Sequence, residues 1–154
     1  MFRLKIYSDG ACWGNPGHSA IAFMILDEQD RVLREHSEYI GVWTNNQAEY
    51  KALILSLKSA LNFGVEAACY SDSKLVVKQM NGEWKVKHPN MRHLWREAIA
   101  IKERFKKISF IHVPRTDRFI ERMDNLANQE INKVAGKMRD NSAKNKMGRQ
   151  EELK

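Results

Sequence analysis

Cysteine, proline and long apolar runs are all scarce in this sequence. Cys12 and Cys69 are its two cysteines and form no Cys-x-x-Cys pair, which argues against a zinc site and against a disulfide-stabilised fold. No run of about 18 apolar residues is present, so we expect no membrane-spanning helix and no membrane partner. The first residues alternate apolar and charged side chains, unlike a signal peptide, and this favours a cytoplasmic location.

Apolar residues and charge are what the sequence does contain. It has 154 residues, 43% of them hydrophobic, which is enough for one compact domain with its own core. Residues 1–77 contain 7 Lys or Arg against 9 Asp or Glu, whereas residues 78–107 contain 9 against 3. This division is typical of a carboxylate site beside a surface for a polyanion, although a solvated basic helix explains the second segment equally well.

The hydrophobic periodicity predicts an α/β fold. Alternating side chains indicate strands, the first of which is expected to end at Asp9, and the first three form an antiparallel meander. The expected strands are residues 2–9, 19–26, 32–39, 67–71 and 108–113. The expected helices are residues 46–63, 73–80, 91–106 and 125–138. The order βββαβαβα implies one five-stranded mixed sheet with helices packed on it.

The end of the chain has a different composition. Residues 1–140 are expected to form the folded domain. Residues 141–154 are basic and lack an apolar face, so we expect a disordered C-terminal tail.

Four acidic residues stand where the backbone is expected to change direction. Asp9 ends the first strand, and Glu49 lies in the first turn of the long helix. Asp72 follows the fourth strand, and Asp124 begins the last helix. Each has a simpler explanation alone: a turn for Asp9, a capping box with Asn46 for Glu49, and helix caps for the other two.

Taken together, the four acids favour a metal site. If the first and fourth strands are neighbours, Asp9 and Asp72 emerge side by side at one edge of the sheet. Carboxylates so close repel one another unless cations lie between them, and hard oxygen ligands suit Mg²⁺ or Mn²⁺. Two such ions roughly 4 Å apart support in-line phosphodiester cleavage. The residues alone therefore favour a metal-dependent nuclease.

Three extended motifs resemble those of type 1 ribonuclease H. They are YSDGACWGNPG at residues 7–17, TNNQAEYKAL at residues 44–53 and YSDS at residues 70–73. The resemblance covers roughly residues 2–135, with the motifs in order and correctly spaced. It implies the ribonuclease H-like fold, a catalytic domain at residues 1–140, and cleavage of the RNA strand of RNA–DNA hybrids to 3′-hydroxyl and 5′-phosphate ends.

The resemblance also implies roles for individual residues. It implies two Mg²⁺ ions, replaceable by Mn²⁺, and the catalytic ligands Asp9, Glu49, Asp72 and Asp124. Glu49 would also meet RNA 2′-hydroxyls, together with the backbone of Gly10, Ala11 and Cys12. The residues implied to contact bases or phosphates across the minor groove are Asn15, Asn46 and Gln47. Thr44 and nearby amides would hold a DNA phosphate at a helix N-terminus, with local capping as the alternative.

The fourth motif departs from the family pattern. Ile120 and Met123 stand where the family usually has Asn and Ala. The segment that begins at Asp124 still fits, so Asp124 is the expected fourth ligand and Asp117 the alternative.

The loop before the last helix also departs from the pattern. Residues 114–118 contain no counterpart of the mobile His that many members carry. Arg115 or Arg118 is expected to supply the electrostatic part of its role, although Arg cannot be a general base. His112, on the preceding strand, is expected to be structural.

The basic helix that some members insert as a substrate-binding handle has no room in residues 81–90, so the chain resembles the compact branch. Basic and aromatic side chains are expected to grip the DNA backbone instead. These are Trp84, Lys85, Lys87, Arg92 and Arg96. The alternative is that the Lys side chains are merely solvated and that Trp95 is core.

Two other functions on this fold remain open at this point. One is an inert module that binds hybrids or RNA, but the four retained carboxylates argue against it. The other is an enzyme that acts on DNA, such as a resolvase or transposase core, and the hybrid-reading segment at residues 45–49 argues against that one. We expect a monomer whose partner is an RNA–DNA hybrid.

Overall fold

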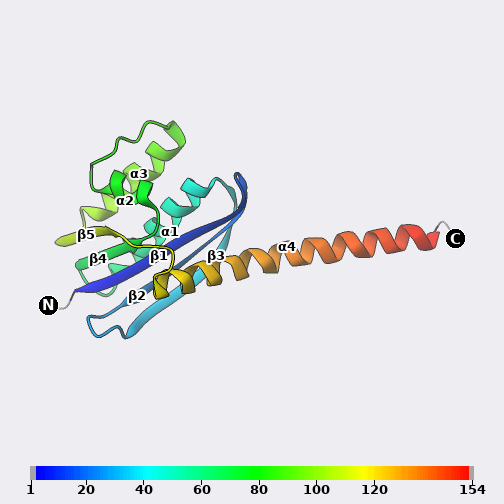
Figure 1. The fold of residues 1–154 in the computed structure, drawn as a ribbon, viewed down its shortest axis with the longest axis horizontal. Helices are drawn as coiled ribbons and strands as arrows, with labels where there is room; N and C mark the ends of the chain where they lie inside the picture. The colour runs from blue at the N-terminus through cyan, green and yellow to red at the C-terminus, as the bar shows by residue number, and fades with distance from the viewer. Residues whose placement is uncertain (1–2, 153–154) are drawn as a thin grey trace.

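A computed structural model describes the backbone of residues 3–152 and the side chains of residues 3–136. Its centre is a five-stranded sheet in the order β3-β2-β1-β4-β5 (Figure 1). The strands are β1 (Leu4–Gly14), β2 (Gly17–Leu26), β3 (Val32–Trp43), β4 (Glu66–Ser71) and β5 (Lys107–His112). β1, β2 and β3 pair antiparallel, whereas β1, β4 and β5 pair parallel. The predicted α/β fold with a five-stranded mixed sheet is confirmed.

Four helices cover the two faces of this sheet. They are α1 (Asn45–Ala60), α2 (Lys74–Met80), α3 (Pro89–Lys102) and α4 (Arg118–Glu152). Both α2 and α3 lie between β4 and β5, so the order of elements is βββαβααβα, which corrects the expected order βββαβαβα by one helix. The helices α1, α2 and α3 share one core cluster with one face of the sheet, whereas α4 packs on the opposite face.

The core on the α4 face explains where that helix begins. Ile120, Met123, Ala127 and Ile131 are buried on α4, at helical spacing, against Tyr7 and other residues of β1 and β2. Two of these buried residues precede Asn125, where the helix was expected to start. The helix therefore begins a full turn and more before that position.

The far end of α4 also differs from expectation. The backbone remains helical to Glu152, and α4 extends well past the sheet in Figure 1. A disordered tail was expected from residue 141, but no proline interrupts residues 118–152, and many of them are good helix formers. Residues 153–154 of the expected tail lie outside the described residues. Within the described part of the chain, no helix combines the length and apolar content needed to cross a membrane.

Candidate active site

Asp9 and Asp72 meet where the parallel pairing of β1 and β4 stops. The last parallel pair is Tyr7 with Tyr70, and both acids lie just beyond it. β1 itself continues to Gly14, because its antiparallel pairing with β2 extends that far. Asp9 is therefore inside β1 and not at its end, which corrects one expectation and confirms that the two carboxylates come together.

Glu49 reaches the same place from α1. It is buried and lies after the first turn of the helix, which contains no acidic residue. The N–H of Gly10 donates to Glu49 Oε1 at 2.9 Å. This approach depends on the missing side chain of Gly10, because a Cβ there would lie 2.5 Å from the carbonyl carbon of Ala48.

The helix ends near these acids are capped by other residues. The caps are Thr44 with Gln47 for α1, Ser73 for α2, and Asp117, which accepts from the N–H groups of Phe119 and Ile120, for α4. The capping box expected between Asn46 and Glu49 is thus wrong. Since the caps are supplied elsewhere, the acids Glu49, Asp72 and Asp124 are free for another task.

The resulting acidic cluster consists of Asp9, Glu49 and Asp72. One carboxylate oxygen from each lies within 4.8 Å of the others. Burial raises the pKa of Asp9 well above its usual range, and the neighbouring Glu49 and Asp72 raise it further. Burial also raises the pKa of Glu49, with Asp72 adding to the effect. Hard oxygen donors that repel one another in this way fit a divalent cation, so these three residues could hold one.

Asp124 and Arg115 complete the walls of the acidic cavity. The cavity has a volume of about 400 Å³ and contains the three clustered acids. Its other lining residues are Gly10, Ala11, Cys12, Asn45, Ser73, Arg115, Asp124 and Asn128. Four acids face one Arg there, so the cavity is rich in carboxylate oxygens. The residues expected at the RNA strand, Gly10 to Cys12, thus lie beside the predicted metal ligands.

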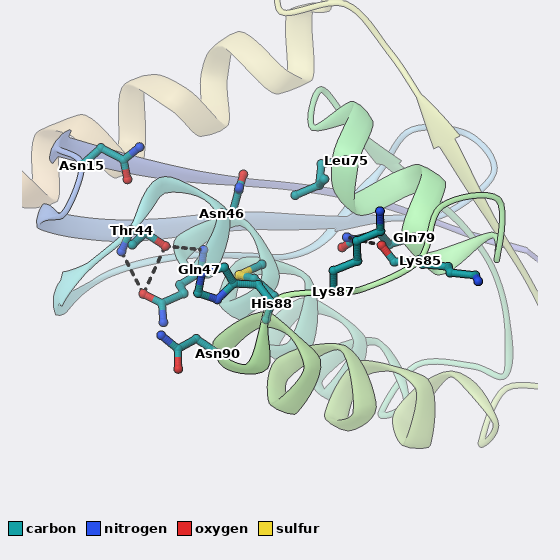
Figure 2. A pocket seen from close by; sticks show the side chains of 11 residues that line it. Asn15, Thr44, Asn46, Gln47, Leu75, Gln79, Lys85, Lys87, His88 and Asn90 are labelled. Atoms are coloured by element: carbon teal, nitrogen blue, oxygen red, sulfur yellow. Dashed lines mark hydrogen bonds between the residues drawn. The ribbon is translucent and has the colours of Figure 1, made fainter.

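A second cavity of about 520 Å³ forms a groove between the start of α1 and the segment that joins α2 to α3 (Figure 2). Six predicted substrate-binding residues line it: Asn15, Thr44, Asn46, Gln47, Lys85 and Lys87. Sequence reasoning missed the others, which are Leu75, Gln79, His88, Asn90 and Met91. They come from two separate segments, α2 and residues 88–91, and the polar Gln79 among the apolar residues of α2 was the one local signal.

Gln79 connects the groove wall to the core. It is 6% exposed, and its Oε1 accepts from the hydroxyl of Tyr50 at 2.6 Å. Its Nε2 donates to the carbonyl of Lys85 at 3.4 Å, and its own carbonyl accepts from the indole of Trp95 at 3.3 Å. The basic loop is thus tied to α1, α2 and α3. Trp95 is partly buried against the core, which agrees with the alternative interpretation that Trp95 is a core residue.

Local capping is present at the N-terminus of α1. The N–H of Thr44 donates to Gln47 Oε1 at 3.0 Å, and the N–H of Asn45 donates to Asn15 Oδ1 at 3.0 Å. Asn15 therefore ties the β1–β2 hairpin to the helix. A phosphate at this end would share these donors with their present acceptors.

Comparisons with known proteins agree with this geometry. A sequence profile described as "Reverse transcriptase-like" matches residues 7–128. A bifunctional protein of Mycobacterium tuberculosis is 40% identical over 135 residues, which are 86% of this chain and 36% of that protein. The crystal structure of ribonuclease H1 from the halophilic archaeon Halobacterium salinarum has 37% sequence identity and a TM-score of 0.81, covering 85% of this chain and 98% of that one. The chain belongs to the ribonuclease H family.

Another structure of the family contains a bound nucleic acid. LC11 ribonuclease H1, isolated from compost by a metagenomic approach, was solved in complex with an RNA/DNA hybrid. It is 40% identical with a TM-score of 0.81, over 86% of this chain and 99% of that one.

The departures of this ribonuclease H sequence from the fourth family motif have a structural reason. Ile120 is 1% exposed and Met123 is fully buried, and both face the sheet in the α4 core. Larger apolar side chains at these positions fill that interface. Asp124 follows on the adjacent flank of the helix, where it lines the acidic cavity, whereas the alternative ligand Asp117 is used as the cap.

Two predicted substrate-binding residues lie away from both cavities. Arg118 stacks 4.5 Å from the centre of the Phe119 ring, and its Nη2 lies 3.5 Å from Asp30 Oδ2, so its side chain is directed to Asp30 and not to the acidic cavity. Trp84 is 43% exposed beside Lys74 and lines neither cavity. Of the two Arg residues weighed for the missing His, the structure brings only Arg115 to the acids.

His112 has the structural position that was expected. Its Nε2 lies 3.2 Å from the carbonyl oxygen of Asp72, so the ring helps to fix the backbone that carries this acid.

Asp124 and Asp117 can be told apart by mutation. Asp124→Ala is expected to lower the turnover rate more than about tenfold, roughly 1.4 kcal/mol of barrier, with partial recovery at higher Mn²⁺. Asp117→Ala should leave turnover within a few-fold and instead lower the free energy of unfolding by about 0.5–2 kcal/mol, because it removes a cap. Rate assays and urea unfolding of both variants measure this, and the opposite ranking would place the fourth ligand at Asp117.

Proposed function

We propose that this chain is a ribonuclease H that hydrolyses the RNA strand of RNA–DNA hybrids. The observation that carries the proposal is the acidic cluster at the end of the parallel pairing, next to a groove lined by Asn15, Thr44, Asn46 and Gln47. The structure of LC11 ribonuclease H1 with an RNA/DNA hybrid supports this choice of substrate. The expected products carry 3′-hydroxyl and 5′-phosphate ends.

The proposed metal ligands are Asp9, Glu49, Asp72 and Asp124, with two Mg²⁺ ions as the native cofactor and Mn²⁺ as a substitute. Bound divalent ions would supply an activated water and charge stabilisation at the leaving oxygen. The protein's own part is to hold the acids in place: Gly10 N–H orients Glu49, and His112 fixes the backbone at Asp72. Arg115, which lines the acidic cavity, would attract a phosphate of the RNA strand.

Substrate selection is proposed to use both cavities. The backbone of Gly10, Ala11 and Cys12 would meet RNA 2′-hydroxyls beside the acids. The groove would take the DNA strand, with Lys85 and Lys87 at its phosphates. The loop that carries these Lys residues is anchored by Gln79, so the compact chain has a fixed basic wall where other members have an inserted helix.

A substrate panel tests the proposal against its rivals. Purified protein is incubated with RNA–DNA, RNA–RNA and DNA–DNA duplexes and with single-stranded RNA, each with and without Mg²⁺. We expect cleavage of the RNA strand of the hybrid and only with the metal. Binding of the hybrid without cleavage would support an inert module, and cleavage of DNA–DNA would support a resolvase-like enzyme.

The basic wall has its own prediction. Replacing Lys85 and Lys87 with Ala should raise the Michaelis constant for the hybrid with little change in kcat. The slope of log K against log salt should shrink by up to about 0.9 for each lost phosphate contact. Fluorescence-detected titrations between low and moderate salt measure the slope.

The matched control removes the same charge elsewhere. Lys106 and Lys107 are exposed at the opposite end of β5 from the acids, and their double Ala variant should bind with the wild-type salt slope. Equal slopes for both double variants would mean that the groove Lys residues are merely solvated. Arg92 lies on α3 outside the groove lining. Adding Arg92→Ala to the Lys85 and Lys87 double variant tests how far the basic face extends.

A further inference from the structure

The fourth carboxylate is held by a hydrogen-bonded chain of three side chains. The indole Nε1–H of Trp13 donates to Asn128 Oδ1 at 2.8 Å. The amide Nδ2 of Asn128 donates to Asp124 Oδ1 at 3.1 Å and to the carbonyl of Asp124 at 2.8 Å. Trp13 and Asn128 are 115 residues apart in the sequence, so only the packing of α4 on the sheet brings them together.

The chemistry of this chain fixes its direction. An indole N–H can only donate, so the Asn128 oxygen must face Trp13 and its NH₂ group must face Asp124. An amide in the opposite orientation would place its oxygen against the carboxylate. Asn128 follows Asp124 at i+4 on α4, which puts both side chains on one face of the helix, and both line the acidic cavity.

We infer that Asn128 is a positioning residue for Asp124 and that Trp13 holds Asn128 in the productive orientation. The inference rests on the proposed function, because it assigns Asp124 to the metal site. One oxygen of Asp124 is kept by the amide, which leaves the other to face the cavity. The chain also joins α4 to the β1–β2 hairpin, which carries Cys12 and Asn15, so the RNA-facing strand and the fourth ligand move as one unit.

Metal titration by NMR, without substrate, tests the connection directly. The chain has four Trp residues, so a ¹⁵N-labelled sample gives four indole signals, and Trp13→Phe identifies that of Trp13 by its loss. The backbone amide of Gly10, which donates to Glu49, reports binding at the acidic cluster. We expect Mg²⁺ to shift both signals with one midpoint in the wild type. In Asn128→Ala, the Gly10 signal should still shift and the Trp13 indole should not.

The outcomes separate this inference from the proposed function. Mg²⁺ could shift the Gly10 signal but leave the Trp13 indole signal unmoved in the wild type. The hydrogen-bonded chain would then not reach the metal site, and the inference would be overturned while the proposed function stands. If neither signal moves, the metal site itself fails and both are overturned.

Kinetics provide a second test on folded variants. Asn128→Ala is expected to lower kcat about tenfold at fixed Mg²⁺ with little change in KM, and to raise the Mg²⁺ concentration needed for half-maximal rate. Asn125→Ala, an exposed Asn on the same helix, is the matched control and should behave as wild type. In an Asp124→Ala background, Asn128→Ala should have almost no further effect on kcat. An undiminished effect there would show that Asn128 acts through the fold and not through Asp124.

Discussion

Replacing Asp72 with Asn is expected to lower the rate of hybrid cleavage at least about a thousandfold, or roughly 4 kcal/mol of barrier. Asp72 has a carboxylate oxygen within 4.8 Å of those of both Asp9 and Glu49, so it is placed to contact any cation in the cluster. Asn keeps the shape of the side chain but removes the charge. Single-turnover rates with saturating protein measure the loss, and hybrid affinity should stay near wild type.

Asp117→Asn is the matched control for this change. It removes the same charge from a residue that lines neither cavity, and Asn is as good an N-cap as Asp. Its turnover should remain within a few-fold of wild type. A purified Asp72→Asn protein that cleaves at a near-normal rate would remove the acidic cluster from the mechanism.

Gly10→Ala should damage both stability and turnover. The added Cβ would lie 2.5–2.7 Å from backbone atoms of Ala48 and Glu49, and a helix backbone cannot move aside as a flexible side chain can. We expect the free energy of unfolding to fall by about 1–3 kcal/mol, as for other overpacked sites. Because α1 carries Glu49, its displacement should also lower the cleavage rate of the protein that remains folded.

Gly136→Ala is the matched comparison, because it is expected to raise the free energy of unfolding and not to lower it. Apart from its chain neighbours and the backbone of its own helix, no heavy atom of the described residues lies within 4 Å of a Cβ built there, and the position is in α4. The free energy of unfolding should rise by about 0.5–1 kcal/mol, because Ala favours a helix over Gly. Urea unfolding of both variants measures the two effects. A Gly10→Ala protein as stable and active as wild type would mean that the contact between β1 and α1 is loose.

Local patterns in the sequence were sufficient for most of the fold. Strand alternation located five strands, and the motifs brought Asp9, Glu49 and Asp72 to one site. The errors occurred where a partner far along the chain decides the outcome. β1 runs beyond Asp9 because β2 pairs with it as far as Gly14, and no residue near Asp9 reports that pairing.

The same reason explains where the structure places site residues differently from the sequence-based expectation. Arg115 and Arg118 stand in one short loop with similar neighbours, and only the position of Asp30 at the β2–β3 turn draws Arg118 away. The start of α4 was misplaced because a cap at Asp117 and an acid at Asp124 are equally plausible from sequence. Asn128 went unnoticed because its partner Trp13 lies on another element.

Helix capping and the proposed metal binding fall to different residues that are close neighbours in the chain. Ser73 caps α2 directly after Asp72, and Asp117 caps α4 two turns before Asp124. A helix cap contributes about 0.5–2 kcal/mol to the free energy of unfolding. Exchanging one good capping residue for another at positions 73 and 117 can therefore change this free energy by a fraction of that amount, while the acids stay unaltered. Under natural selection, a lineage could thus adapt to a warmer or colder habitat at one set of positions while purifying selection holds the other set fixed.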